Sequence, residues 1–220
     1  ADRVGIGIKN HHGEFQLVNG NQTGALMFYY MLRQWKDAGK LTGKEYVVKT
    51  IVTTELMDAI AASYNIPCPN TLTGFKYIAS IIREREGDME YIVGGEESYG
   101  YLIGEFVRDK DAIASCAVLA EMTAWAKDNG HSLIDMLMDM YVEHGFYKER
   151  LISIVRKGMK GADEIQQMMA GFRQNPPQRI AGSEVVRLID YQTSTEKDLV
   201  TGAETVIDFP KSNVLYPGWK

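Results

Sequence analysis

The spacing of apolar residues along the chain predicts strands and helices in alternation. Apolar positions with a period of two, on either side of turn residues, predict a β-hairpin over residues 4–18. A helical period predicts helices over residues 22–38, 54–64, 75–86, 113–128 and 132–143. Short apolar runs at 46–52 and 91–93 predict buried strands, the second followed by a loop to Asp109. We expect a three-layer-type α/β domain with a mixed sheet.

The pattern changes near Phe146, where the regular alternation of strands and helices stops. A helix is predicted over residues 162–172 and strands over residues 148–157, 183–191, 205–209 and 214–216. This combination predicts a second, partial α+β domain.

Composition and charge narrow the class of protein. Hydrophobic residues make up 45% and charged residues 24%, as in ordinary globular proteins, and the net charge of −5 argues against a nucleic-acid partner. No apolar run reaches the length of a membrane span and no leader precedes the first strand, so we expect a protein that is neither exported nor membrane-bound. Cys68 and Cys116, far apart in sequence, favour reduced thiols and a cytoplasmic location. The sequence does not begin with methionine and enters a strand pattern within its first few residues, so we expect it to be a segment of a longer protein.

Residues 94–100, Gly-Gly-Glu-Glu-Ser-Tyr-Gly, carry the most informative chemistry. They directly follow a buried strand, and in open α/β sheets ligands bind beyond the carboxyl ends of strands. Two carboxylates and a hydroxyl in three consecutive positions suit a polyhydroxylated ligand such as a sugar. The alternative interpretation is a glycine-rich turn with solvated acids.

Two further loops precede helices. Residues 108–111, Arg-Asp-Lys-Asp, place basic groups beside a helix start, where the free backbone N–H groups also favour phosphate. Residues 71–76 repeat this arrangement with hydroxyls, a glycine and a lysine. Taken alone, the first loop favours a capped helix start, with Asp109 or Asp111 as the cap, and a capped helix start is also the alternative for the second loop.

Taken together, the three loops resemble the α-D-phosphohexomutase superfamily of phosphoglucomutases and phosphomannomutases. The segment GGEESYGYLIGEFVRDKDAIA resembles its sugar-binding and lysine-bearing loops, TLTGFKYIAS its substrate loop, and ADRVGIGIK the tail of its metal loop. The resemblance implies a remnant of domain two over residues 1–18, domain three over 19–145 and part of domain four over 146–220. The phosphoserine motif of the first domain and the phosphate loop of the fourth are absent from this sequence.

The resemblance also implies roles for individual residues. It assigns substrate binding to Thr73, Gly74, Lys76, Gly95, Glu96, Glu97 and Ser98. Among these, Glu96 and Ser98 are expected to contact sugar hydroxyls. It assigns Arg108 and Lys110 to catalysis, through charge near the phosphoryl group or proton transfer. Asp2, followed by Arg3, is the remaining aspartate of the loop that binds Mg²⁺, and glucose 1,6-bisphosphate is the implied activator.

The expected function is therefore that of part of a phosphohexomutase. In the full-length enzyme, a phosphoserine and a bisphosphorylated sugar would interconvert glucose 1-phosphate and glucose 6-phosphate. Mannose or pentose phosphates are alternative substrates, and a non-catalytic module that binds a sugar phosphate is the alternative of another class. Since the phosphoserine motif is missing, we expect these 220 residues to be inactive alone.

Overall fold

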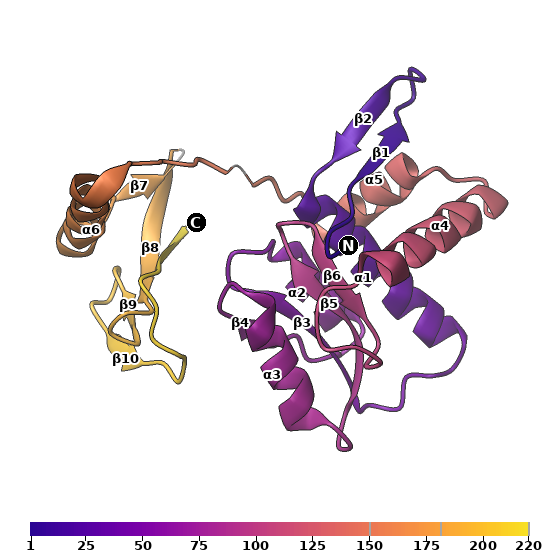
Figure 1. Ribbon diagram of the computed structural model, residues 1–220, viewed down its shortest axis with the longest axis horizontal. Coiled ribbons are helices and arrows are strands. Elements are labelled where there is room, and N and C mark those ends of the chain that lie inside the picture. The colour runs from indigo at the N-terminus through magenta and orange to yellow at the C-terminus, as the bar shows by residue number, and fades with distance from the viewer. Residues whose placement is uncertain (150, 181, 220) are drawn as a thin grey trace. The chain divides into compact units, whose positions relative to one another are not determined.

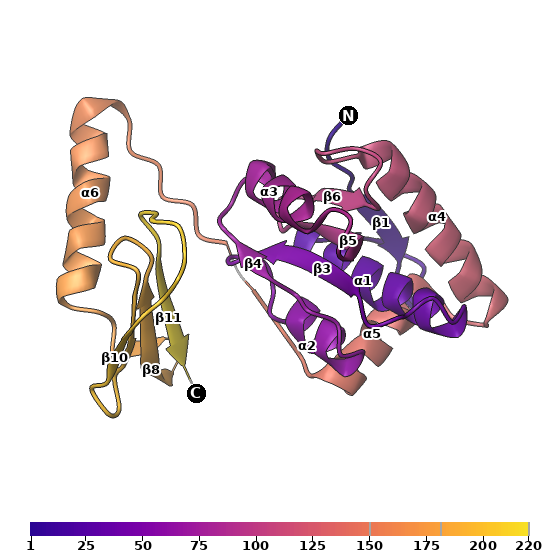
Figure 2. The same ribbon diagram turned by 90° about the horizontal axis from the view of Figure 1, so that it is seen from below.

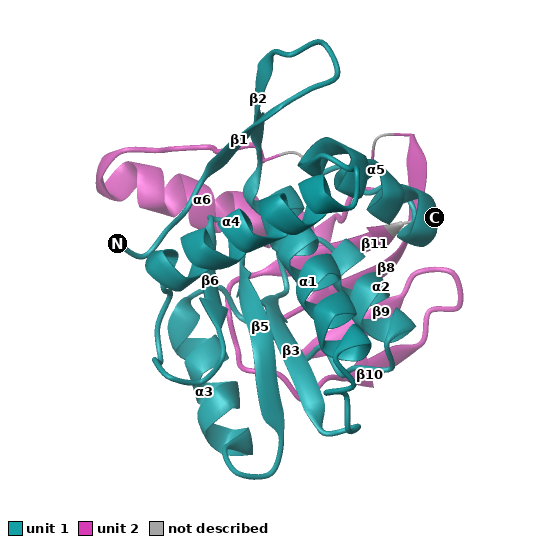
Figure 3. Ribbon diagram, turned by 90° about the vertical axis from the view of Figure 1, so that its right-hand side faces the viewer, with its two compact units in different colours: residues 1–150 teal, residues 151–220 magenta. Residues whose placement is uncertain are grey.

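The computed structural model describes residues 1–149, 151–180 and 182–219, which form two compact units, residues 1–150 and 151–220 (Figure 3). The first unit holds the elements β1 (Ile6–Lys9), β2 (Phe15–Val18), α1 (Gly20–Asp37), β3 (Glu45–Thr50), α2 (Leu56–Ser63), β4 (Asn70–Thr71), α3 (Phe75–Arg85), β5 (Glu90–Glu96), β6 (Gly100–Ile103), α4 (Ala112–Asp128) and α5 (Leu133–His144). The second holds α6 (Gly158–Gln174), β7 (Arg179–Ile180), β8 (Ser183–Asp190), β9 (Thr195–Asp198), β10 (Glu204–Val206) and β11 (Leu215–Trp219).

A four-stranded mixed sheet forms the centre of the first unit. Its strands lie in the order β4-β3-β5-β6, with β4, β3 and β5 parallel and β6 antiparallel to β5. Helix α3 covers one face, while α1 and α2 lie on the other (Figures 1 and 2). Alternate strand residues divide between these layers, since Val48 packs with α3 and Val47 with α1. The predicted three-layer α/β class with a mixed sheet is confirmed.

The helix starts follow from local capping chemistry. Asn19 and Gln22 form a capping box that starts α1 at Gly20, two residues before the predicted start at residue 22. Asp111 caps α4 and Ser132 caps α5. Asp111, and not Asp109, is therefore the cap that begins the helix after the basic loop.

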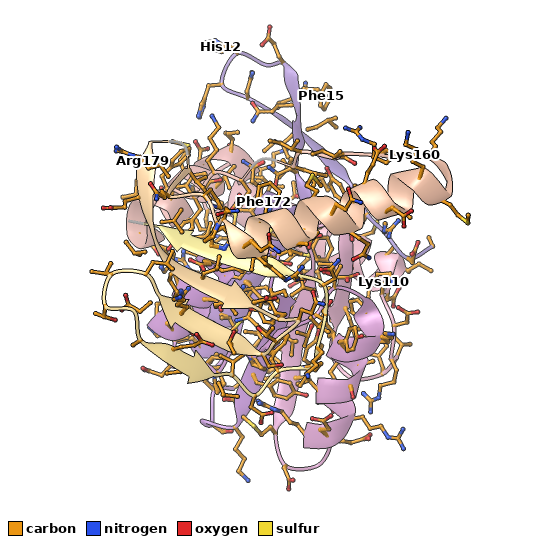
Figure 4. The ribbon with its side chains drawn as sticks, turned by 90° about the vertical axis from the view of Figure 1, so that its left-hand side faces the viewer. His12, Phe15, Lys110, Lys160, Phe172 and Arg179 are labelled. Carbon is orange, nitrogen blue, oxygen red and sulfur yellow. The ribbon has the colours of Figure 1, made fainter. Side chains whose placement is uncertain are left out.

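The first eighteen residues form the predicted β-hairpin, with Ile6 opposite Val18. Figure 4 shows its tip, with His12 and Phe15, extending away from the sheet of the first unit. Phe15 and Leu17 are 77% and 86% exposed, whereas Val18 belongs to the core. In the same turn, His11 Nε2 lies 3.6 Å from the Asp135 carboxylate of α5.

Two sequence predictions need correction. Residues 94–109 are not one loop, because β5 continues to Glu96 and Gly100–Ile103 form β6, which completes a β-hairpin. The predicted strand at residues 148–157 is wrong over the described positions, which carry no strand, and its residue 150 lies outside the described residues. Leu151 and Ile152 in this segment are exposed, so their apolar pattern does not reflect burial in a sheet.

The second unit combines one helix with an antiparallel sheet of order β10-β9-β8-β11, and β7 pairs with β8. An ion pair between Arg173 Nε and Asp190 Oδ2, 2.9 Å apart, connects α6 to β8. The α+β character of this unit is as expected, although β7 and β9 were not predicted. Within the described part of the chain, no helix is both long and apolar enough to cross a membrane.

Candidate functional site

The β5–β6 hairpin forms the centre of the candidate site. Residues 97–99 make its turn, and Tyr99 has a left-handed backbone with φ of 70°. Gly94 and Gly95 lie inside β5, where an added Cβ would contact the Tyr91 hydroxyl at 2.6 Å or the Gly100 carbonyl at 2.8 Å, respectively. Close packing within the sheet therefore explains both glycines, and contact of Gly95 with a substrate stays a prediction.

Glu96 joins the hairpin to the start of α3. Its side chain belongs to a residue only 4% exposed, and Oε1 accepts a hydrogen bond of 2.7 Å from the Gly74 backbone N–H. Gly74 is the residue before α3 and has φ of 117°, a conformation that favours glycine. The sugar loop and the substrate loop predicted from sequence are thus in direct contact.

Lys110 brings the third loop to the same place. Its amine lies 5.1 Å from the centre of the Phe75 ring and its aliphatic stem runs against Gly100, so the side chain is 14% exposed. The amine also donates to Asp109 at 3.1 Å. The Lys110 backbone N–H and amine lower the pKa of the Asp109 carboxyl below its ordinary value.

Glu97 points to a different neighbour. Its Oε2 lies 3.3 Å from the hydroxyl of Thr50, the last residue of β3, and 3.1 Å from the hydroxyl of Thr53, three residues further on. These threonines were not predicted as site residues, although Thr53 directly follows the strand predicted at 46–52 and ligands bind beyond the carboxyl ends of such strands. Their signal in the sequence is the pair of hydroxyls spaced around the end of that strand.

Arg108 is held apart from the Glu96–Gly74 contact. Its guanidinium donates to the Glu105 carbonyl at 3.0 Å and to Glu86, the residue after α3, at 2.6 Å. It borders a pocket of about 480 Å³, lined by Lys76, Ala79, Ser80, Arg83, Arg108 and Asp109. Lys76 is exposed and its amine lies over the Tyr77 ring. The pocket lining thus includes three cationic side chains, those of Lys76, Arg83 and Arg108.

Thr73 is exposed and Ser98 is partly exposed. At the amino end, Asp2 and Arg3 are exposed, and the Val4 N–H that follows them donates to the Tyr99 carbonyl at 3.1 Å. This bond places the N-terminal segment beside the hairpin turn.

A profile for phosphoglucomutase/phosphomannomutase, alpha/beta/alpha domain III, matches residues 19–143, more than half of the chain. The chain belongs to this family. A phosphoglucomutase of Staphylococcus aureus strain MRSA252 is 37% identical over 98% of the chain, and one from strain USA300 is 36% identical over the same share. The chain spans 38% of the length of these two relatives.

The fold agrees with this membership. The solved structure of parafusin, a phosphoglucomutase from Paramecium in its open form, superimposes with a TM-score of 0.58. That alignment covers 94% of this chain and 33% of the other, at 17% sequence identity, and so it supports the fold alone.

The family resemblance also implied Mg²⁺, which prefers several oxygen ligands. Asp2 is a single exposed carboxylate, and no group of three or more His, Cys, Asp or Glu side chains suited to a metal occurs among the described residues. The ligands present in this phosphohexomutase chain therefore do not by themselves form a magnesium site.

Proposed function

We propose that this chain supplies the sugar-recognition part of a phosphoglucomutase that interconverts glucose 1-phosphate and glucose 6-phosphate. The observation that carries the proposal is the 2.7 Å bond between Glu96 and the Gly74 N–H, with Lys110 packed beside both loops. These contacts bring together residues 71–76, 94–100 and 108–111, which are separate in sequence. Each of these segments has chemistry suited to a sugar phosphate.

The roles of the residues follow from their surroundings. With Oε1 bonded to Gly74, the second oxygen of Glu96 accepts from a sugar hydroxyl, and the partly exposed Ser98 bonds a neighbouring hydroxyl. Lys110 stabilises negative charge at the phosphoryl group or moves a proton there. Lys76 and Arg108 border a pocket whose cationic lining suits the phosphate of the same ligand.

The remaining chemistry depends on groups beyond these residues. We propose that residues 1–18 and 146–220 correspond to parts of the second and fourth domains, and that 19–145 form the third. In the whole enzyme Mg²⁺ would stabilise phosphoryl charge, and glucose 1,6-bisphosphate would act as activator. Since the 220 residues contain no phosphoserine motif, they bind sugar phosphate without turnover when isolated.

Glucose is the proposed sugar because the relatives from S. aureus are named phosphoglucomutases. Residues 96–100 with 108–111 are also closer to the phosphoglucomutase pattern than to that of phosphomannomutases. A cytoplasmic location is proposed because neither of the two cysteines forms a disulfide, and free thiols are typical of cytoplasmic proteins.

Calorimetric titration of the chain with glucose 1-phosphate tests this function. A hydrogen bond to a charged group contributes about 1.5–3 kcal/mol when desolvated, so Glu96→Ala should weaken binding by about tenfold or more. Lys110→Met should weaken binding of the phosphate ester but not of free glucose. The matched control is Glu90→Ala, an exposed glutamate at the start of β5. Equal affinity of wild type and Glu96→Ala would contradict the proposal.

A further inference from the structure

The turn between β5 and β6 is constrained by contacts to its backbone. Tyr99 has φ of 70°, a conformation that residues with a side chain rarely adopt. The Tyr99 carbonyl accepts from the Val4 N–H, and the first residue of α1, Gly20, packs directly against the Glu97 carbonyl. A sparsely populated backbone conformation persists only where the surrounding structure imposes it.

The Glu97 side chain supplies one of these constraints. Its Oε2 lies 3.3 Å from Thr50 Oγ1 and 3.1 Å from Thr53 Oγ1, and the two hydroxyl oxygens are 2.7 Å apart. Each hydroxyl has a single proton, so two protons serve three contacts. Because the two hydroxyls are within bonding distance, one donates to the other. The shorter distance indicates that Thr53 donates to Glu97 and that Thr50 donates to Thr53.

The threonines are themselves anchored in the sheet by a buried lysine. The Lys49 amine, with a side chain only 3% exposed, donates to the Thr53 carbonyl at 3.3 Å and lies 3.5 Å from the Thr50 carbonyl. It also pairs with the Asp58 carboxylate of α2 at 2.9 Å. A buried ammonium group needs such partners, so this arrangement fixes the backbone that carries both hydroxyls.

We infer that Glu97 is a positioning residue: its carboxylate, clamped by Thr50 and Thr53, holds the strained turn in the shape that presents Glu96 and Ser98 to the sugar. Glu96 bonds toward the start of α3, whereas Glu97 bonds toward the end of β3. Adjacent glutamates therefore have different tasks. The inference rests on the proposed function for its role in binding, but the clamp itself is testable without a ligand.

The ligand-free test is the backbone order of the turn, measured by ¹⁵N relaxation. In the wild type, Ser98 and Tyr99 should have order parameters near 0.85, the value of rigid backbone. Glu97→Ala and Thr53→Val should lower them to below about 0.6, while Thr50→Val has a smaller effect. Glu97→Gln, which keeps an oxygen acceptor for Thr53, should stay close to wild type. Glu90→Ala is the control for removal of a glutamate from the same hairpin, at the start of β5 and away from the turn.

The second measurement is the affinity of the same variants for glucose 1-phosphate. If the binding-competent turn falls to about one-tenth of the population, apparent affinity falls about tenfold in both Glu97→Ala and Thr53→Val. Glu97→Gln should remain within about twofold of wild type. The most informative result is a loss of affinity in Thr53→Val equal to that in Glu97→Ala. A valine at position 53 removes the hydrogen bond to Glu97 but leaves the Glu97 carboxylate in place.

The outcomes separate the two proposals. A rigid turn in Glu97→Ala overturns the clamp, whatever the ligand does. Weak binding in Glu97→Ala with normal binding in Thr53→Val also overturns it, because Glu97 would then contact the ligand directly. If the wild type does not bind glucose 1-phosphate while the turn loosens as predicted, the proposed function fails and the clamp stands.

Discussion

Replacement of Gly20 by alanine should disturb the sugar turn through pure steric overlap. An added Cβ would overlap the Glu97 carbonyl oxygen and lie 2.7 Å from its carbon and 3.1 Å from the Tyr99 nitrogen. Cβ atoms essentially never lie within 3.0 Å of another heavy atom, and the overlap with the oxygen is the most severe, so the turn or the start of α1 has to move by more than about 1 Å. The Gly20 carbonyl also accepts a 2.6 Å bond from the buried Tyr101 hydroxyl, which resists that movement.

Overpacking of this kind costs about 1–3 kcal/mol, partly offset by a helix-propensity gain of at most about 1 kcal/mol for alanine. We expect Gly20→Ala to lower the free energy of unfolding of the first unit by about 1–2 kcal/mol, measured by urea denaturation. Gly24→Ala is the matched control, four residues along the same helix. Its Cβ would meet the flexible end of Met57 and approach the Tyr101 ring at 3.0 Å, with no backbone among its nearest atoms. Its cost should therefore be smaller, and a Gly20→Ala protein as stable as Gly24→Ala would refute the steric argument.

Three further predictions concern stability and reactivity. Hydrogen bonds from the Ser132 hydroxyl and N–H lower the pKa of the Asp135 carboxyl, so this group stabilises the fold above pH about 4 and the contribution disappears as pH falls through its folded-state pKa. Ser132→Ala should raise that pKa toward its ordinary value in a carboxyl NMR titration, and an unchanged pKa would contradict the assignment. Asp111→Ala removes two bonds to backbone amides at the start of α4 and should lower the free energy of unfolding by about 1 kcal/mol in urea, whereas no change would exclude the cap. The exposed Cys116 should react rapidly with a thiol reagent, and the partly exposed Cys68 should react more slowly because burial raises the pKa of its thiol; equal rates in the native protein would contradict this.

The sequence was most informative where local chemistry and burial agree. The helices of the first unit were predictable because caps such as Ser132 precede apolar residues at helical spacing. The strand Gly100–Ile103 was not, because its pairing with β5 is a contact in space and the preceding glycines resemble a loop. Conversely, residues 151–155, apolar except for Ser153, have the pattern of a strand without its burial, since Leu151 is 92% exposed.

The same limit applies to the candidate site. The chemistry of Glu96 and Lys110 was evident from residue type and loop position, and the structure brings their loops together. The separate direction of Glu97 could not be predicted, because it depends on Thr50 and Thr53 being neighbours across the sheet. The hydrogen bond from Arg108 to Glu86 could not be predicted either, because Glu86 lies 22 residues earlier in the chain.

The most direct test of the sugar site is a ¹H–¹⁵N chemical-shift titration of the wild-type chain with glucose 1-phosphate. The largest shifts should fall in residues 94–100, with smaller ones in 73–76 and 108–111, and all should follow one binding curve. Free glucose should perturb 94–100 but leave Lys110 almost unchanged, because it lacks the phosphate. Shifts concentrated elsewhere, for example around His131 and His144, would contradict the account and leave the family membership as a statement about fold alone.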